Sequence, residues 1–346
     1  MSRTHENTQA SKTINNALAD TNQRVNKTRI KKPLDKKPVI NTLVVVGLGL
    51  IGGSLALALK KAQACNKVIG ISRKPAVAQR ALERAIADEV FASITEVASE
   101  LGAGDVIFIA VPTLSVRDVL KEIHASVSTD VTITDGASVK GSVLEDVKAV
   151  YGNVPPQVVL GHPIAGSEQS GVEAAKADLY AHHRIILTPT EQTGKQHLAR
   201  VTAMWQIINA EVLELDVQNH DAILGATSHL PHVIAFSLVD TLAHDSHNED
   251  IFRYAAGGFR DFTRIASSDV VMWRDIMLAN QQAVLEAIDL FSGNLAQLRN
   301  TIAQGDSQAL TEIFGRAKIA RDQFTHLLDE RKASLKARAS SLDDEL

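Results

Sequence analysis

The stretch LVVVGLGLIGG, residues 43–53, decides the fold of this chain. Its first four residues are apolar and mostly β-branched, as in a short strand buried in a parallel sheet. Gly47, Gly49 and Gly52 follow with the spacing G-x-G-x-x-G, and residues 54–61 have the composition of a helix. A strand, a glycine turn and a helix in this order predict a site for the pyrophosphate of a dinucleotide.

Each glycine has a physical task in such a turn. Gly47 allows the tight bend, Gly49 lets the backbone approach a phosphate, and Gly52 lets the helix pack closely on the strand. The free N–H groups at the start of the helix, together with the helix dipole, then hold the phosphates. The residues that we expect to line the dinucleotide are Gly47, Gly49, Leu50, Ile51, Gly52, Ser72, Arg73, Lys74, Val111 and Pro112.

The sequence after this unit alternates between short apolar runs and helical segments. Further strands are predicted at residues 67–71, 105–111, 131–135, 158–160, 184–188 and 211–215, and helices at 75–87, 114–124, 142–151 and 194–209. This alternation predicts an α/β fold with a Rossmann-type, doubly wound parallel sheet. Such a sheet binds ligands beyond the carboxyl ends of its strands.

Strand signals end near residue 216, and the chain beyond it is predicted to be an all-α helical domain. Apolar residues recur at helical spacing over 222–242, 270–293 and 310–335. The predicted domains are a disordered basic arm at 1–38, a dinucleotide-binding domain at 39–216, a helical domain at 217–335 and a polar tail at 336–346.

Composition limits the class of protein. The chain has 346 residues, of which 45% are hydrophobic, and a formal net charge of −4. This charge gives no reason to expect nucleic acid or an anionic membrane as a partner. Cys65 is the only cysteine, which fits a reducing compartment. We find no signal-peptide core and no apolar run near the ~20 residues of a membrane helix, so we expect a cytoplasmic protein.

The N-terminal arm is strongly basic. Residues 1–38 contain nine Lys or Arg against three acids, a net charge of about +6, and almost no large apolar side chains. Such a segment is expected to be a solvated tail, with contact to an acidic surface as the alternative.

The end of the second predicted strand bears on the choice between NAD and NADP. An acid there would bind the adenosine ribose and favour NAD. This chain has Ser72, Arg73 and Lys74 instead. A hydroxyl followed by two cations suits a 2′-phosphate, because an arginine can grip phosphate with a forked pair of donors. NADP is therefore favoured, and the alternative is that both cations solvate a loop while NAD binds without the acid.

A candidate base follows the predicted strand at 158–160. The next residues read GHPIAGSE, and we interpret 161–168 as a shaped loop that carries His162. Histidine is the side chain best suited to proton transfer near neutral pH, and the carboxyl end of a strand is where this fold places its chemistry. Ser138 follows the preceding strand and can come near His162, although it can also be an ordinary helix cap.

The helical domain carries a second group of polar motifs. His229 and His232 lie three residues apart in SHLPH, so a helix would direct both imidazoles to one side. No cysteine or acid cluster accompanies them, so we predict no metal site. Arg260 and Arg264 lie four apart in GGFRDFTR. They are a candidate clamp for a carboxylate, and the alternative is a pair of solvated surface arginines.

With these motifs in view, the chain resembles the prephenate dehydrogenase family of tyrosine biosynthesis, including its arogenate and dual-substrate cyclohexadienyl members. The resemblance covers about residues 42–325. It rests on the glycine turn and on four more specific segments: GHPIA at 161–165, SHLPH at 228–232, GGFRDFTRIA at 257–266 and MWRD at 272–275.

The resemblance implies oxidative decarboxylation of prephenate to 4-hydroxyphenylpyruvate, with reduction of NAD or NADP. In that reaction His162 would accept the proton of the 4-hydroxyl while hydride leaves C4, and Ser138 would hydrogen-bond near His162. Arg264 matches the arginine that holds a substrate carboxylate. The other substrate-site residues that the family implies are His229, His232, Glu168, Asp261 and Trp273. Family members pair through the helical domain, so a homodimer is expected.

Two alternatives remain at this point. An arogenate or dual-substrate dehydrogenase would use the same residues, because arogenate differs from prephenate only by an amino group on the side chain. A dinucleotide sensor without catalytic activity would keep the glycine turn, but it would not need His162, Ser138 and Arg264 together.

Overall fold

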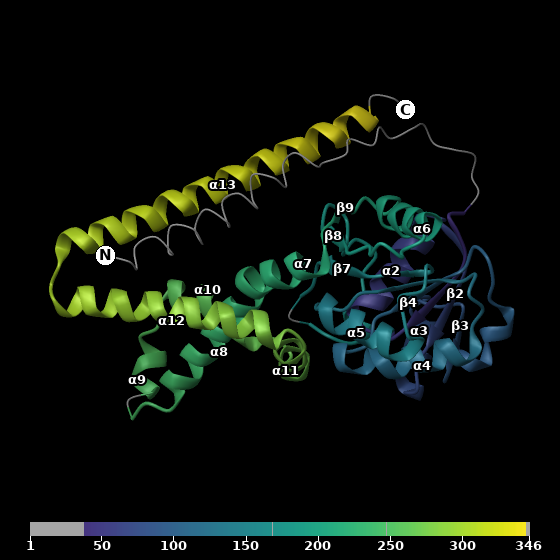
Figure 1. The fold of residues 1–346 in the computed structure, drawn as a ribbon, viewed down its shortest axis with the longest axis horizontal. Helices are drawn as coiled ribbons and strands as arrows, with labels where there is room; N and C mark the ends of the chain where they lie inside the picture. The colour runs from purple at the N-terminus through teal and green to yellow at the C-terminus, as the bar shows by residue number, and fades with distance from the viewer. Residues whose placement is uncertain (1–37, 168, 247, 344–346) are drawn as a thin grey trace. The chain divides into compact units, whose positions relative to one another are not determined.

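The computed structural model describes residues 38–167, 169–246 and 248–343 (Figure 1). The predicted basic arm, apart from its last residue, lies outside these ranges, and so does Glu168. The long C-terminal helix runs to Asp343 and includes most of the predicted polar tail.

The first sheet confirms the predicted doubly wound architecture. Its six strands are all parallel and follow the order β3-β2-β1-β4-β5-β6. They are β1 (Ile40–Val46), β2 (Cys65–Ile71), β3 (Glu89–Phe91), β4 (Val106–Ile109), β5 (Thr132–Asp135) and β6 (Val158–Val159). Strand β3 was not predicted, because its three residues are too short to show a hydrophobic period.

Helices connect and cover these strands. The α-helices are α2 (Leu50–Lys61), α3 (Pro75–Glu83), α4 (Val116–Ser126), α5 (Lys140–Tyr151) and α6 (Lys195–Gln206), and the 3₁₀ turns are η1 (Ile94–Glu96), η2 (Ala98–Glu100), η3 (Thr113–Ser115) and η4 (Val172–Ala174). Successive strand residues face opposite layers. Val45 and Phe108 belong to one core with Trp205, whereas Val44 and Ile107 belong to the core on the other face. Both faces of the sheet are therefore buried.

The last three strands correct the prediction of one continuous parallel sheet. Strands β7 (Gly161–Ile164), β8 (Arg184–Leu187) and β9 (Glu211–Glu214) form a separate sheet, in which β7 pairs antiparallel to β8 and β8 pairs parallel to β9. The partners are remote in sequence, so no local pattern reveals their direction.

His162 accordingly lies in a strand, and the predicted loop was wrong. It pairs with Ile186, and Pro163 pairs with Ile185. A proline within a run normally argues against a strand, but β7 is at the edge of its sheet, where the missing N–H of proline is tolerated.

The chain beyond β9 is helical, as predicted. Its elements are α7 (Val217–Leu224), the π-helical turn η5 (Gly225–His229), α8 (Leu230–Ala243), α9 (Asn248–Arg253), α10 (Gly257–Thr263), the 3₁₀ turn η6 (Arg264–Ser267), α11 (Val270–Ala279), α12 (Gln281–Ala303) and α13 (Ser307–Asp343). The single helix predicted at 270–293 is interrupted at Asn280. The side chain of Asn280 donates to the backbone oxygen of Asp221 and to His229, and these contacts hold the break between α11 and α12.

The helical region leaves large apolar side chains uncovered. Leu290 on α12 is 59% exposed and Ile319 on α13 is 60% exposed. The continuous segment Val217–Ala243 is also long and apolar enough to span a membrane by length and composition, with 22% of its apolar window buried. This corrects the expectation that no apolar run approaches that length, although core helices of globular proteins have the same composition. Exposed apolar faces of this extent indicate a partner surface.

Candidate active site

The glycine turn joins β1 to α2 with almost no free space at two of its glycines. Gly47 has a φ of +101°, and a Cβ there would lie 2.5 Å from the oxygen of Ala110. A Cβ on Gly52 would lie 2.1 Å from the oxygen of Gly47 and 2.6 Å from Cγ1 of Val45. Gly49, by contrast, faces open space, because a Cβ added there would have no neighbouring atom within 4 Å. The structure therefore leaves room for a ligand at Gly49 and none at Gly47 or Gly52.

The other residues expected to line the dinucleotide follow the two strands that flank β1 in the sheet. Val111 and Pro112 come after β4, and Ser72, Arg73 and Lys74 come after β2. The side chains of Arg73 and Lys74 are exposed, and the Ser72 hydroxyl accepts a hydrogen bond of 3.3 Å from the Lys74 backbone. The nearby Asp118 at the start of α4 has its pKa lowered chiefly by a hydrogen bond from Lys121, with a smaller effect of the Arg73 charge. Arg73 is therefore near the start of α4.

His162 is the buried centre of the candidate active site. The residue is only 8% exposed, and its Nδ1 lies 2.9 Å from Nε2 of His220 on α7. Burial holds the pKa of His162 well below 6.5, and the charges of His220 and Lys140 lower it further. His162 is therefore uncharged at neutral pH and able to accept a proton.

His220 and Asp221 were not singled out from the sequence. Nδ1 of His220 lies 2.7 Å from Oδ1 of Asp221. The Asp221 carboxylate also accepts the backbone N–H of Lys140 at 2.9 Å and of Gly141 at 2.7 Å, both at the start of α5. The only sequence signal was an adjacent His-Asp pair at the start of the helical domain, 58 residues after His162. Such a pair alone does not indicate a partner.

An ion pair buried beneath His162 was also missed. Nζ of Lys140 contacts Oδ2 of Asp135 and donates to the oxygen of Gly161 at 2.6 Å, and both charged side chains are almost completely buried. The N–H of Gly161 donates to Oδ1 of Asp135 at 3.2 Å. Burial lowers the pKa of Lys140, and the charge of Asp135 opposes that effect. The pair ties the start of α5 and the end of β5 to the residue before His162.

The two histidines of the SHLPH segment face the same side, as their spacing predicts, and both contact Trp273. His232 stacks on the indole at a centroid distance of 3.4 Å, and His229 meets it edge-on at 6.1 Å. Burial lowers the pKa of His229 to about 4. Trp273 packs in turn on Val139, which follows Ser138. The helical region therefore reaches the loop that carries Ser138.

The remaining predicted site residues are not brought to His162 by any contact in the described part of the chain. Ser138 is half-buried, and its hydroxyl has no hydrogen bond among the described residues. Arg264 and Asp261 have exposed side chains, and Asp261 pairs with Arg260 at 3.4 Å. Glu168 is outside the described residues. No group of three potential metal ligands occurs within the described ranges.

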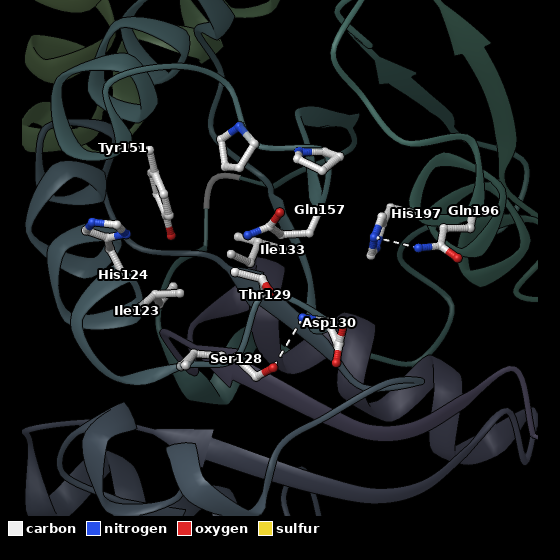
Figure 2. Close-up of a pocket in the computed structure, with 13 residues that line it drawn as sticks. Ile123, His124, Ser128, Thr129, Asp130, Ile133, Tyr151, Gln157, Gln196 and His197 are labelled. Carbon is white, nitrogen blue, oxygen red and sulfur yellow. Dashed lines mark hydrogen bonds between the residues drawn. The ribbon is translucent and has the colours of Figure 1, made fainter.

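A separate cavity of about 550 Å³ lies away from this site. Figure 2 shows Tyr151 and His197 on opposite sides of it, with Gln157 between them. Asp130 and Gln157 come just before β5 and β6, so the cavity is at the amino ends of these strands. Because Rossmann-type sheets bind ligands at the opposite, carboxyl edge, the cavity is not the dinucleotide site.

Comparisons with known proteins give one consistent result. The family model "Prephenate dehydrogenase, nucleotide-binding domain" matches residues 55–214, and "Prephenate dehydrogenase, dimerization domain" matches residues 216–316. A prephenate dehydrogenase of Bacillus subtilis (strain 168) is 36% identical over 288 residues, which are 82% of this chain and 76% of the relative. A cyclohexadienyl dehydrogenase of Zymomonas mobilis is 35% identical over 286 residues, which are 82% of this chain and 96% of the relative.

A solved structure extends the likeness to three dimensions. The prephenate dehydrogenase of A. aeolicus, in complex with hydroxyphenyl propionate and NAD⁺, is 37% identical and has a TM-score of 0.77. The match covers 85% of this chain and 100% of that one.

Proposed function

The chain belongs to the prephenate dehydrogenase family, and we propose that it oxidises prephenate to 4-hydroxyphenylpyruvate with loss of carbon dioxide. The observation that carries this proposal is the buried His162, which lies in β7 within the domain that the family model matches and whose Nδ1 is 2.9 Å from Nε2 of His220. A base, a hydride acceptor and anchors for two carboxylates are what the reaction needs from a protein. Aromatisation of the ring supplies the driving force.

The glycine turn fits a nicotinamide dinucleotide. The open space at Gly49 and the start of α2 form a cradle where backbone N–H groups can meet a pyrophosphate. When bound, NAD or NADP would accept the hydride from the substrate.

We propose that His162 accepts the proton of the substrate's 4-hydroxyl and that Ser138 orients this hydroxyl. Arg264 is proposed to bind a substrate carboxylate, with His229, His232 and Trp273 around the ring. We keep Glu168 and Asp261 as proposed substrate-site residues.

An arogenate or dual-substrate activity is the second candidate, because a similar relative is named cyclohexadienyl dehydrogenase. Steady-state kinetics with prephenate and with arogenate, each with NAD and with NADP, tests the function. Turnover of prephenate is the expected result. Dinucleotide binding without turnover of either substrate would instead favour a sensor.

We also propose a homodimer that forms through the helical domain. The match to a dimerisation domain over 216–316 supports it, and so do the exposed apolar side chains of α12 and α13. The cytoplasm is the proposed compartment, in keeping with biosynthetic relatives.

NADP is the proposed preferred cofactor, and replacing Arg73 and Lys74 tests it. The double variant Arg73→Ala, Lys74→Ala should lower kcat/KM for NADP by roughly 10- to 100-fold, the usual worth of charge-assisted hydrogen bonds, while kcat/KM for NAD changes little. The control is Lys61→Ala, which removes an exposed cation from the last turn of α2. A wild-type protein that strongly prefers NAD would refute the proposal.

The glycine turn gives a matched pair of variants. Gly49→Ala should keep the thermal stability of the protein, because nothing lies within 4 Å of the new methyl group. It should still weaken dinucleotide binding by about tenfold or more, about 1.4 kcal/mol, by filling the space of a phosphate. Gly52→Ala should unfold at a lower urea concentration than the wild-type protein, because its methyl group would clash with the backbone oxygen of Gly47. Calorimetric titration and urea unfolding measure the two effects, and wild-type binding by Gly49→Ala would contradict the assigned cradle.

A further inference from the structure

Three side chains form a hydrogen-bonded line that ends at the proposed base. Nδ1 of His162 lies 2.9 Å from Nε2 of His220, and Nδ1 of His220 lies 2.7 Å from Oδ1 of Asp221. Both imidazoles are buried, and His220 is 0% exposed. Each of these three nitrogens faces one partner in the line, so the protons between them can be placed by hydrogen-bond rules.

Asp221 determines which atom donates and which accepts in each hydrogen bond of this line. Burial raises the pKa of Asp221, but hydrogen bonds from His220 and from the backbone of Lys140 and Gly141 outweigh this and bring the pKa below its usual value. The ionised carboxylate can only accept hydrogen bonds. Nδ1 of His220 must therefore carry a hydrogen. Burial lowers the pKa of His220 from 6.5, so its ring is neutral at neutral pH. Nε2 of His220 is then an acceptor.

The same rule fixes His162. Since Nε2 of His220 accepts, Nδ1 of His162 must donate, and a neutral His162 then has its free electron pair on Nε2. We infer that His220 and Asp221 are positioning residues that hold His162 in the tautomer whose Nε2 is the base. That His162 acts as a base rests on the proposed function. The positions of the protons on His162 and His220 follow from the hydrogen bonds alone and do not rest on it.

The opposite tautomer is disfavoured by the same contacts. A hydrogen on Nε2 of His162 would leave two electron pairs facing each other across 2.9 Å, unless His220 also reversed. A reversed His220 would place its Nδ1 electron pair 2.7 Å from the Asp221 carboxylate. Losing a hydrogen bond to a charged group costs on the order of 1.5–3 kcal/mol, which selects one tautomer by roughly 10- to 100-fold.

The line is also placed to stabilise the charge that forms during the reaction. When Nε2 of His162 takes the substrate proton, the ring becomes a cation that still donates to His220, and His220 still donates to Asp221. The other groups that influence His162 are Lys140 on α5 and His229 in η5, and both disfavour a positive charge there. The Asp135 carboxylate beside Gly161 is paired with Lys140, so Asp221 is the acid that can oppose these charges through its hydrogen bond to His220.

The structure holds Asp221 firmly at its end of the line. Its carboxylate binds two backbone N–H groups at the start of α5, where the helix dipole also favours a negative charge. A Cβ on Gly141 would lie 2.7 Å from Oδ2 of Asp221, so a glycine permits this approach. Asn280 donates to the backbone oxygen of Asp221 at 2.9 Å. The residue is thus held by two parts of the chain besides its own helix.

Nuclear magnetic resonance of protein labelled with ¹⁵N-histidine tests the inference directly. At neutral pH the wild-type spectrum should show His162 with its hydrogen on Nδ1 and none on Nε2, with the signals assigned by their loss in His162→Asn. A hydrogen on Nε2 of the neutral ring would overturn the inference. This measurement needs no turnover, so it is independent of the proposed function.

Kinetics of two variants give the second test. His220→Phe removes both hydrogen bonds, and it should lower kcat by roughly 10- to 100-fold with little change in KM. Asp221→Asn removes the charge that favours protonated His162, so the acid limb of the kcat/KM profile should move to lower pH. The control is His197→Phe, which removes another buried histidine, bonded to Thr132, and should leave kcat unchanged.

The outcomes separate the two proposals. Wild-type kcat in a folded His220→Phe protein would overturn the positioning role. Absence of turnover in the wild-type protein would overturn the proposed function and leave the tautomer to be decided by the spectrum. If His220→Phe does not fold, the wild-type spectrum and the Asp221→Asn profile decide the question.

Discussion

Replacing the proposed base, His162→Asn, should lower kcat by roughly 10²–10⁴-fold with little change in KM, which is the usual worth of a positioned proton acceptor. The side chain is buried in β7 and uncharged, so its role is to accept a proton and not to attract the anionic substrate. Asparagine keeps a polar side chain of similar size but cannot take up a proton. Steady-state kinetics with saturating dinucleotide measures the effect.

A contrasting variant makes this prediction sharper. Arg264→Ala should raise KM strongly, because the proposed role of Arg264 is to bind a substrate carboxylate. Wild-type turnover by His162→Asn would refute the mechanism. Equal losses of kcat in the two variants would show that their proposed roles are not distinct.

The pH profile of the wild-type protein follows from the same residue. A base with a lowered pKa is active above that pKa, and it loses activity only as the pH falls through it. Since burial holds the pKa of His162 well below 6.5, kcat/KM should still be near its plateau at pH 6.5 and should fall only in more acidic solution. An acid limb centred at or above pH 6.5 would contradict this assignment.

The second large effect is expected from the buried ion pair under the site. Lys140→Met should lower the free energy of unfolding by about 3–5 kcal/mol, because it leaves the buried Asp135 carboxylate without its cation. The change also removes the hydrogen bond from Lys140 to the oxygen of Gly161, next to His162. Urea unfolding at a fixed protein concentration measures the loss of stability.

Two controls accompany Lys140→Met. Lys148→Met changes an exposed lysine on the same helix, where the pair with Glu145 is solvated, and it should cost less than about 1 kcal/mol. The double variant Asp135→Asn, Lys140→Met removes both charges and should recover part of the lost stability. Equal stability of Lys140→Met and Lys148→Met would show that the buried pair does not hold the site together.

Much of the fold could be predicted because its signals are local. The run of β-branched residues in β1 and the glycines after it lie within one short stretch, and their chemistry depends only on neighbours in the sequence. The change from alternating strands and helices to helices alone is likewise visible in successive windows. The direction of β7 was not predictable, because its partner β8 is remote along the chain and the hydrogen bonds between them depend on their packing.

In the candidate site, too, residues in short local motifs could be predicted, and contacts between distant residues could not. His162 could be proposed as the base from the sequence because its short motif is distinctive. The SHLPH spacing predicted that His229 and His232 lie on one side of a helix, and both contact Trp273. The surroundings of His162 could not be identified. Lys140 precedes the helix predicted at 142–151, and nothing local shows that its ammonium group is buried against Asp135.

By itself, then, the sequence determined the dinucleotide turn, the order of the two domains, the family and the identity of the proposed base, since each depends on residues that are close together along the chain. Only the tertiary structure decided which nitrogen of His162 is free to act. That choice depends on His220 and Asp221, which belong to the helical region. The contact between His162 and His220 forms only when β7 and α7 pack together.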